Sequence, residues 1–225
     1  MKIALLLTGQ IRNAGECFSS IKQHIINPYE VDVYINTWFP ENKISHHNGS
    51  INNDSSLKDI IEMYSPKNIS IEDYESDFCK RIIELADTIR RDYPETNHKN
   101  IFFQFYKFYK GFNLIPNYQD YDMIIRGRFD LKFNTFPDLN LLDSSKLYIP
   151  KGWDHRDGYN DLFAFGNPAL IEQYCNLFNN ILTYLEEGCP LHPEAILKYH
   201  LTKLNIQPER IEIEYFLRNI PVFNH

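Results

Sequence analysis

Charged side chains gather at the end of an apolar run in the second half of the chain. The run 121–126 (YDMIIR) leads into Gly127, and Arg126, Arg128 and Asp130 stand at alternate positions there. A carboxylate at the end of a buried strand can ligate a divalent cation that also binds diphosphate oxygens, and arginines can hold phosphate or a sugar hydroxyl. The alternative is a salt-bridged strand end without a ligand. Because open α/β sheets bind ligands at the carboxyl ends of their strands, the three charges favour a functional site.

A second candidate binding loop follows the first apolar run, residues 2–7 (KIALLL). It reads Thr8-Gly9-Gln10-Ile11-Arg12. Gly9 would let the backbone approach a ligand closely, and Arg12 could clamp a phosphate. The spacing is neither G-x-G-x-x-G nor that of a P-loop, so dinucleotide binding of the Rossmann type and ATPase chemistry both lack their signatures.

The third candidate is the loop 151–161 (KGWDHRDGYND), which precedes an apolar strand. Loops this rich in ionisable and aromatic side chains usually face a ligand, although a solvated loop is the alternative. A partly desolvated carboxylate has a raised pKa and suits general-base work, and Asp161 at the strand entry fits that description. We expect Trp153 and Tyr159, together with Trp38, to lie beside a sugar.

The fourth candidate is His192-Pro193-Glu194, which reads as the start of a helix. One interpretation is structural, because a cap and an acidic residue in the first turn stabilise a helix. The functional interpretation makes His192 a metal or phosphate ligand and Glu194 an acceptor-binding or basic residue. We expect no chemical role for the remaining histidines that we singled out, which are His46, His47, His200 and His225.

The elements that would position these side chains alternate between strand and helix, which predicts a single α/β domain over residues 1–225. Strands are predicted at 2–7, 31–37, 68–71, 121–126, 146–149 and 161–165. Helices are predicted at 14–26, 57–64, 77–92, 98–114, 168–186 and 193–204. The segment 98–114 is aromatic at nearly every position, which predicts a helix buried on more than one face. Residues 41–56 are expected to form a polar surface loop, and 206–217 a strand pair or an edge.

Composition narrows the classes of function. The 225 residues carry a net charge of −7, and the sequence pI is near 5.6, which argues against non-specific nucleic-acid binding. The sequence has no apolar run of 18 residues, so we expect no membrane span. The four cysteines are widely scattered, and reduced thiols in a cytoplasmic protein are the simplest account. Aromatic residues make up 15% of the chain, from coding bias or from a ring-lined cleft, and we assign most of them to the core.

Several stretches together resemble a known family. They are IALLLTGQIRN, YINTW, QFYK (104–107), YDMIIRGRFDLKF and NDLFAFGN. In this order they are similar to small GT-A-type glycosyltransferases, including those encoded by large algal viruses and by bacterial surface-polysaccharide clusters. The similarity spans most of the chain and is weakest over 41–95 and 205–225.

The resemblance implies one GT-A-like (Rossmann-like) domain with a central, mostly parallel sheet flanked by helices. It implies a nucleotide-diphosphate-sugar donor, a glycan or other hydroxyl acceptor, and Mn²⁺ or Mg²⁺ as cofactor. Residues 1–115 would be the nucleotide-binding half and 116–225 the metal and acceptor half. Arg128-Phe129-Asp130 occupies the place of the family's D-x-D motif, with Asp130 as the metal-binding carboxylate. Since Arg128 replaces the first Asp, it could supply positive charge directly, leaving the ion weakly held or dispensable.

The resemblance also implies roles for the other candidate residues. Thr8, Gly9 and Arg12 would hold the nucleotide. In an inverting enzyme, Asp161 or, failing it, Glu194 would be the base that activates the acceptor, and both inversion and retention stay open at the sequence level. His192 would be a late metal ligand. Two other functions remain open at the sequence level: a non-catalytic nucleotide-sugar or carbohydrate-binding module on the same fold, and a nucleotidyltransferase.

Overall fold

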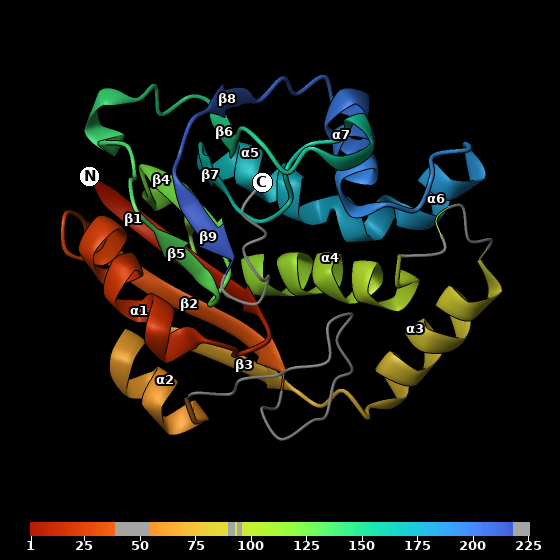
Figure 1. Cartoon of the computed structure of the whole chain (residues 1–225), viewed down its shortest axis with the longest axis horizontal. Helices are drawn as coiled ribbons and strands as arrows, with labels where there is room; N and C mark the ends of the chain where they lie inside the picture. The colour runs from red at the N-terminus through yellow and green to blue at the C-terminus, as the bar shows by residue number, and fades with distance from the viewer. Residues whose placement is uncertain (39–54, 90–92, 94–95, 218–225) are drawn as a thin grey trace, which may run out of the picture.

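A seven-stranded, mostly parallel sheet forms the centre of the molecule (Figure 1). The computed structural model describes residues 1–38, 55–89, 93 and 96–217. The strand order is β3-β2-β1-β4-β7-β6-β8, and only β7 runs against the other strands of this sheet. The strands are β1 (Lys2–Gly9), β2 (Glu30–Trp38), β3 (Asn68–Glu72), β4 (Met123–Gly127), β6 (Leu147–Pro150), β7 (Ala164–Gly166) and β8 (Glu209–Ile211).

Strand β1 is apolar without alternation because both faces of the sheet are covered. Its odd positions Ile3, Leu5 and Leu7 belong to one buried cluster, and Ala4 and Leu6 belong to the other. Successive side chains of a strand point to opposite faces, so one run of apolar residues supplies both cores. The molecule therefore has three layers, with the sheet in the middle.

Helices of different sequence regions form the two outer layers. One contains α1 (Ala14–Ile21) and α2 (Leu57–Tyr64) together with a small antiparallel sheet of β5 (Leu131–Phe133) and β9 (Tyr215–Leu217). The other is built around α4 (His98–Phe112), which Figure 1 shows crossing the molecule below α5. It also contains α3 (Asp77–Thr88), α5 (Pro168–Cys175), α6 (Ile181–Glu186) and α7 (Pro193–Lys203).

The structure confirms the predicted α/β class and most of the elements, with local differences. The predicted helix 168–186 is divided by a 3₁₀ segment, Asn176–Asn180, between α5 and α6. The predicted helix 14–26 ends in a π-helical turn, Lys22–Ile26. In the tail, β8 lies on the sheet edge beside β6, whereas β9 pairs with β5, a strand that the sequence pattern did not predict. Residues 41–54 of the expected polar loop, with His46 and His47, lie outside the described residues, as does His225.

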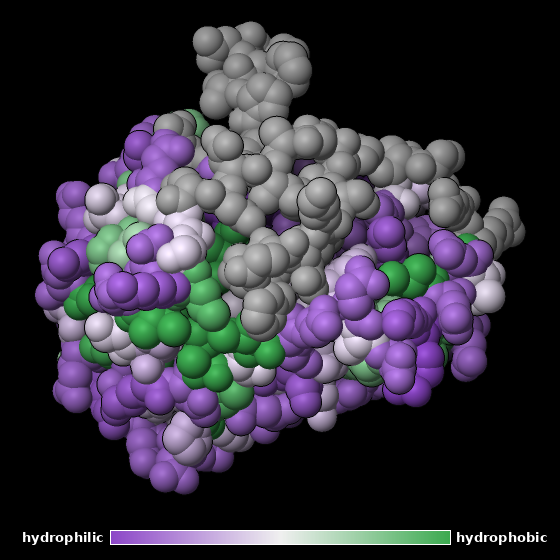
Figure 2. Space-filling view, turned by 90° about the horizontal axis from the view of Figure 1, so that it is seen from below, coloured by the Kyte–Doolittle hydropathy of each residue, from purple (hydrophilic) through white to green (hydrophobic). Residues whose placement is uncertain are grey.

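The described residues also bear on membrane crossing, on the state of the cysteines and on the character of one face of the molecule. Within the described ranges, no helix has the length and apolarity needed to cross a bilayer. All four cysteines are buried and no disulfide joins them. Figure 2 shows a mostly hydrophilic face, with an apolar area on the side where Figure 1 places α1 and α2.

The connection between strands places a ligand crevice beside β1. The chain runs outward from β1 to β2 and β3, then returns to the opposite side of β1 as β4. At such a reversal of strand order, the loops after the two neighbouring strands leave a crevice at their carboxyl ends. The loops concerned, 10–13 and 128–130, are the first two candidate binding loops of the sequence.

Candidate functional site

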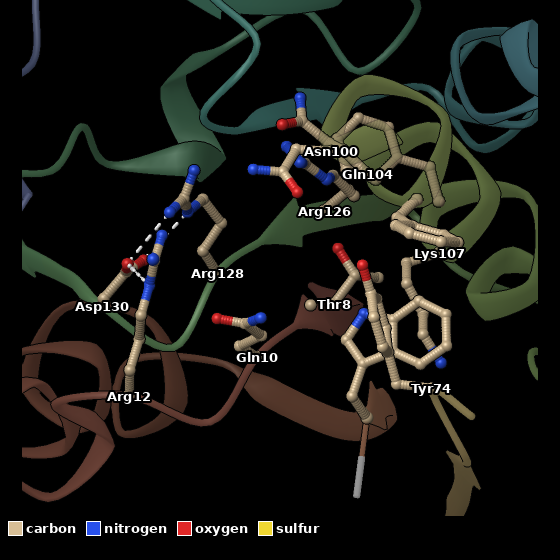
Figure 3. A pocket seen from close by; sticks show the side chains of 14 residues that line it. Thr8, Gln10, Arg12, Tyr74, Asn100, Gln104, Lys107, Arg126, Arg128 and Asp130 are labelled. Atoms are coloured by element: carbon tan, nitrogen blue, oxygen red, sulfur yellow. Dashed lines mark hydrogen bonds and ion pairs between the residues drawn. The ribbon is translucent and has the colours of Figure 1, made fainter. Parts of the chain in front are cut away.

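A pocket opens at the carboxyl ends of β1, β2 and β4, where the strand order reverses (Figure 3). The loops after β1 and β4 form one end, and the aromatic helix α4 forms a wall. The residues that line it are Thr8, Gly9, Gln10, Arg12, Trp38, Tyr74, Asn100, Phe103, Gln104, Lys107, Phe108, Arg126, Arg128 and Asp130. Four of these carry positive charge and one carries negative charge, so the lining has a net charge of 4 − 1 = +3.

Asp130 holds two arginines together at one end of the pocket (Figure 3). Its Oδ2 lies 2.6 Å from Arg12 Nε and 2.9 Å from one terminal nitrogen of Arg128, whose Nε lies 2.9 Å from Oδ1. Burial by itself would raise the pKa of Asp130, but the charges and hydrogen bonds of Arg128 and Arg12 outweigh it and lower the pKa to about 2. Asp130 is therefore ionised at neutral pH and accepts from both guanidinium groups.

Arg126 is buried without an ion-pair partner among the described residues. One terminal nitrogen donates to the carbonyl oxygens of Asp161 and Leu162, each at 2.9 Å, and the guanidinium carbon lies 3.3 Å from the centre of the Phe108 ring. Within the described parts of the chain, neither its Nε nor Gln10 Oε1 has a hydrogen-bond partner. Unsatisfied buried donors and acceptors are costly, so the pocket suits a polar ligand that supplies partners to both.

The opposite end of the pocket is aromatic. The ring of Trp38 lies edge-on to Tyr74 and Phe103, with ring centres 5.6 and 5.4 Å away. Lys107 Nζ stands 3.7 Å from the centre of the Trp38 ring and 2.6 Å from Glu72 Oε2. Trp38 and Phe103 are each 4% exposed, whereas Tyr74 is only partly buried, so Tyr74 is the ring of this wall that is most open to a ligand.

Lys107 is a structural cation of this wall. Its Nζ also donates to Asn36 Oδ1 at 2.9 Å and to the carbonyl oxygen of Thr37 at 2.8 Å. Together with Glu72 these contacts use all three of its donors. Burial lowers its pKa to about 8, while the Glu72 charge acts in the opposite direction. Lys107 thus fixes α4 to the end of β2, and its donors are used within the protein.

Asp161 lies directly behind the pocket lining. Gln104 of α4, which lines the pocket, donates from Nε2 to Asp161 Oδ2. Asp161 is 5% exposed, and burial, followed by the nearby charge of Glu194, raises its pKa. A buried carboxylate with a raised pKa, beside a polar pocket, is a candidate proton acceptor.

Glu194 and His192 form a pair at the start of α7. His192 Nδ1 lies 2.9 Å from Glu194 Oε2, and both side chains are largely buried. The loop before Asp161 packs tightly on this helix: Tyr159 N donates to Glu194 O, and a Cβ added at Gly158 would stand 2.2 Å from the Glu194 carbonyl carbon. The loop 151–160 therefore positions Glu194 relative to Asp161.

The structure brings together most of the sequence candidates. Seven of them line one pocket: Thr8, Gly9, Arg12, Trp38, Arg126, Arg128 and Asp130. The pocket takes lining residues from both predicted halves, so neither 1–115 nor 116–225 contains a complete binding site. Asp161 and Glu194 lie near each other behind it.

Three of the candidates for ligand or metal binding, Trp153, Tyr159 and His192, lie outside the pocket lining. Trp153 is 40% exposed and does not line the pocket. Its loop is tied to the β8 edge of the sheet, because Asp154 lies 2.6 Å from Arg210. Tyr159 also lies outside the lining, and Arg210 lies over its ring, with the guanidinium carbon 5.2 Å from the ring centre. His192 pairs with Glu194 and does not join Asp130 in the pocket.

Among the described residues that line the pocket, Asp130 is the carboxylate that could contact Mn²⁺ or Mg²⁺ alongside diphosphate oxygens. Both oxygens of Asp130 accept hydrogen bonds from arginine, and His192 lies outside the lining. No group of three or more His, Cys, Asp or Glu in these parts of the chain is arranged to hold a metal. The predicted metal stays a prediction.

Several lining residues were not predicted from the sequence. Gln104 and Lys107 stand three positions apart in an aromatic helix, which puts both on one face, and this polar pair was the available signal. Gln10 follows Gly9 in the candidate loop without a distinguishing pattern. Tyr74 and Asn100 come from segments where no motif marks them.

Comparison with known proteins adds no family assignment. Neither a scan against protein-family models nor a search of curated proteins found a match to the chain. The functional argument therefore rests on the site.

Proposed function

We propose that this protein is a glycosyltransferase that moves a sugar from a nucleotide-diphosphate sugar to a hydroxyl of a glycan or other acceptor. The observation that carries the proposal is the division of one pocket into a cationic end and an aromatic end. A nucleotide sugar has the same division, since a planar base is separated from the sugar by two phosphates. The resemblance of the sequence to GT-A-type enzymes supports the same conclusion.

The cationic end suits the diphosphate. Arg12 and Arg128 meet there on a single carboxylate, Asp130, and Arg126 lines the same pocket. Guanidinium groups form strong, directional hydrogen bonds with phosphate oxygens. Negative charge grows on the diphosphate as the sugar leaves, so cations fixed at this place would stabilise the transition state more than the ground state.

The aromatic end and the amide side chains suit the rest of the donor. A base would pack at the aromatic end against Tyr74, which is only partly buried beside Trp38 and Phe103. Gln10 and Asn100 also line the pocket and can exchange hydrogen bonds with sugar or ribose hydroxyls.

The proposed reaction has one bond broken and one formed. The bond between the anomeric carbon and the diphosphate oxygen breaks, and the diphosphate leaves with the electron pair. The acceptor oxygen bonds to the anomeric carbon, and its proton passes to a carboxylate. We assign this general-base role to Asp161, whose pKa is raised and which contacts Gln104 in the pocket, with Glu194 as the alternative base.

Donor titration tests the proposal. We expect one of UDP-, GDP- or dTDP-sugars to bind the full chain by calorimetry and to be hydrolysed slowly or transferred to an acceptor. Arg126→Lys keeps the charge but lacks the planar fork, and should weaken donor binding by about tenfold. Arg81→Lys on the exposed face of α3 is the control and should change nothing.

Two outcomes would contradict the proposal. Donor binding without hydrolysis or transfer to any acceptor tried would indicate a binding module on the same fold. Absence of binding for every nucleoside diphosphate and nucleotide sugar would remove the proposed function altogether.

A further inference from the structure

We propose that Arg12, Asp130 and Arg128 form a preformed clamp that binds the donor diphosphate without a divalent cation, with Asp130 as the positioning residue of the two arginines. This inference rests on the proposed function, because it assigns the clamp to a nucleoside diphosphate. It reverses the metal-ligand role that the resemblance implies for Asp130.

The hydrogen bonds of Asp130 carry the first step. A carboxylate has about four lone-pair sites, and Asp130 accepts three hydrogen bonds from arginine nitrogens, at 2.6, 2.9 and 2.9 Å. Its side chain is 2% exposed. Three of the four sites are therefore taken by arginine donors, and a cation could bind both oxygens only by displacing a guanidinium group, which would leave an arginine without its counter-charge.

The clamp has the same net charge as a carboxylate that holds a divalent cation. A carboxylate holding a divalent cation has a net charge of −1 + 2 = +1. Asp130 between two arginines has a net charge of −1 + 1 + 1 = +1. The two arrangements therefore offer a diphosphate the same net charge, and the clamp adds guanidinium donors that match phosphate oxygens. Arg126 contributes a further positive charge to the same pocket lining.

The two arginines of the clamp come from loops after different strands. Arg12 comes from the loop after β1 and Arg128 from the loop after β4, so the clamp spans the crevice where the strand order reverses (Figure 3). Their side chains are 19% and 18% exposed. Two like charges would separate if left alone, and Asp130 holds them side by side at the pocket. Charges fixed before the ligand arrives need no reorganisation when it binds.

Calorimetric titration with UDP and with GDP, in EDTA and in Mn²⁺, tests the clamp on the full chain. For whichever nucleotide binds, we expect Kd in EDTA to lie within about twofold of Kd in Mn²⁺. Arg128→Lys keeps the charge but loses the two-point contact with Asp130, so Kd should rise about tenfold in both buffers. The matched control is Arg210→Lys, which alters another Arg–Asp pair, outside the pocket lining, and should leave Kd unchanged.

Asp130→Asn separates positioning from a general structural role. A positioning residue affects the diphosphate only, so UDP or GDP affinity in EDTA should fall about tenfold while affinity for the corresponding nucleoside stays the same. Equal loss for nucleotide and nucleoside would overturn the positioning role. If Asp130 binds metal instead, the nucleotide will bind only in Mn²⁺, and Asp130→Asn will remove just that binding.

Inorganic pyrophosphate distinguishes failure of the clamp from failure of the proposed function. Nucleotide binding that requires Mn²⁺ would overturn the clamp and leave the glycosyltransferase proposal standing. Pyrophosphate binding in EDTA, with no nucleotide binding in either buffer, would keep the clamp and overturn the proposed function. If neither pyrophosphate nor any nucleotide binds, both are wrong.

Discussion

At the scale of single residues, the pocket depends on carboxylates with opposite environments. Asp130 is surrounded by guanidinium groups, which lower its pKa to about 2 against the effect of burial. Asp161 is buried near another acid, Glu194, and its pKa is raised. Oppositely shifted carboxyl groups divide the work: one stays ionised to hold cations, and the other is suited to take up a proton.

Acid should weaken the fold through Asp130. Its pKa is near 3.9 in the unfolded chain and about 2 in the folded protein. The ionised carboxylate therefore contributes about 2 kcal/mol to the free energy of unfolding above pH 4, and this contribution is lost as pH falls toward 2. Urea unfolding should show a higher free energy of unfolding for the wild type than for Asp130→Asn above pH 4, and this difference should disappear as pH falls toward 2. The control Asp120→Asn, at an exposed position, should show no such difference from the wild type. A difference for Asp130→Asn that does not change with pH would refute the lowered pKa of Asp130.

Asp161 should determine how the rate of sugar transfer falls on the acidic side of its pH dependence. A general base works in its ionised form, so the transfer rate should fall as pH decreases through the pKa of Asp161, which lies above the usual range of aspartate. Asp161→Asn should lower kcat by roughly 10²- to 10⁴-fold with little change in donor Kd. The exposed Asp157→Asn in the preceding loop is the control. A variant that retains the wild-type rate and acid limb would exclude Asp161 as the base.

At the scale of elements, α4 joins the sheet to the site. Its aromatic residues fill the core, and Gln104 and Lys107 reach the pocket and the end of β2. The helix approaches β1 closely at Gly111, where a Cβ would stand 3.0 Å from a methyl carbon of Thr8. Stability and pocket shape therefore depend on the same helix.

Lys107→Met should destabilise the protein strongly. The change removes a buried ammonium group that bonds Asn36, Thr37 and Glu72, and leaves their oxygens without a partner. Breaking a buried pair of this kind costs about 3 kcal/mol. Lys110→Met, an exposed position of the same helix, should cost under about 0.5 kcal/mol. Urea unfolding measures both, and equal effects would show that the buried contacts of Lys107 add no stability.

Sequence patterns predicted the elements more completely than the site. Apolar runs mark β1 and β4 because both faces of those strands are buried, and the charges after β4 indicated the cationic end of the pocket. Short strands such as β5 carry no such pattern, because three residues cannot show a period. The exposed position of Trp153 could not be read from its loop, since the Asp154–Arg210 contact that fixes it joins residues 56 positions apart.

At the scale of the whole molecule, the pocket at the carboxyl ends of the strands carries positive charge although the chain as a whole is acidic. The chain has a net charge of −7, whereas the pocket lining has +3. An anionic ligand is thus favoured at the pocket and disfavoured over the protein as a whole. Since β1 from the first half of the chain pairs with β4 from the second, the site and the central sheet are shared by both halves.

Ligand binding should therefore stabilise the whole molecule in a single step. A nucleoside diphosphate held between the loops after β1 and β4 binds only the folded chain, and at a hundredfold excess over Kd it adds about 2.7 kcal/mol. For a domain of this size that corresponds to a rise in Tm of about 5–10 °C. Calorimetry should show one transition, with equal calorimetric and van't Hoff enthalpies, that moves as a unit. Two transitions, of which the ligand shifts only one, would mean that the halves unfold separately despite the shared sheet.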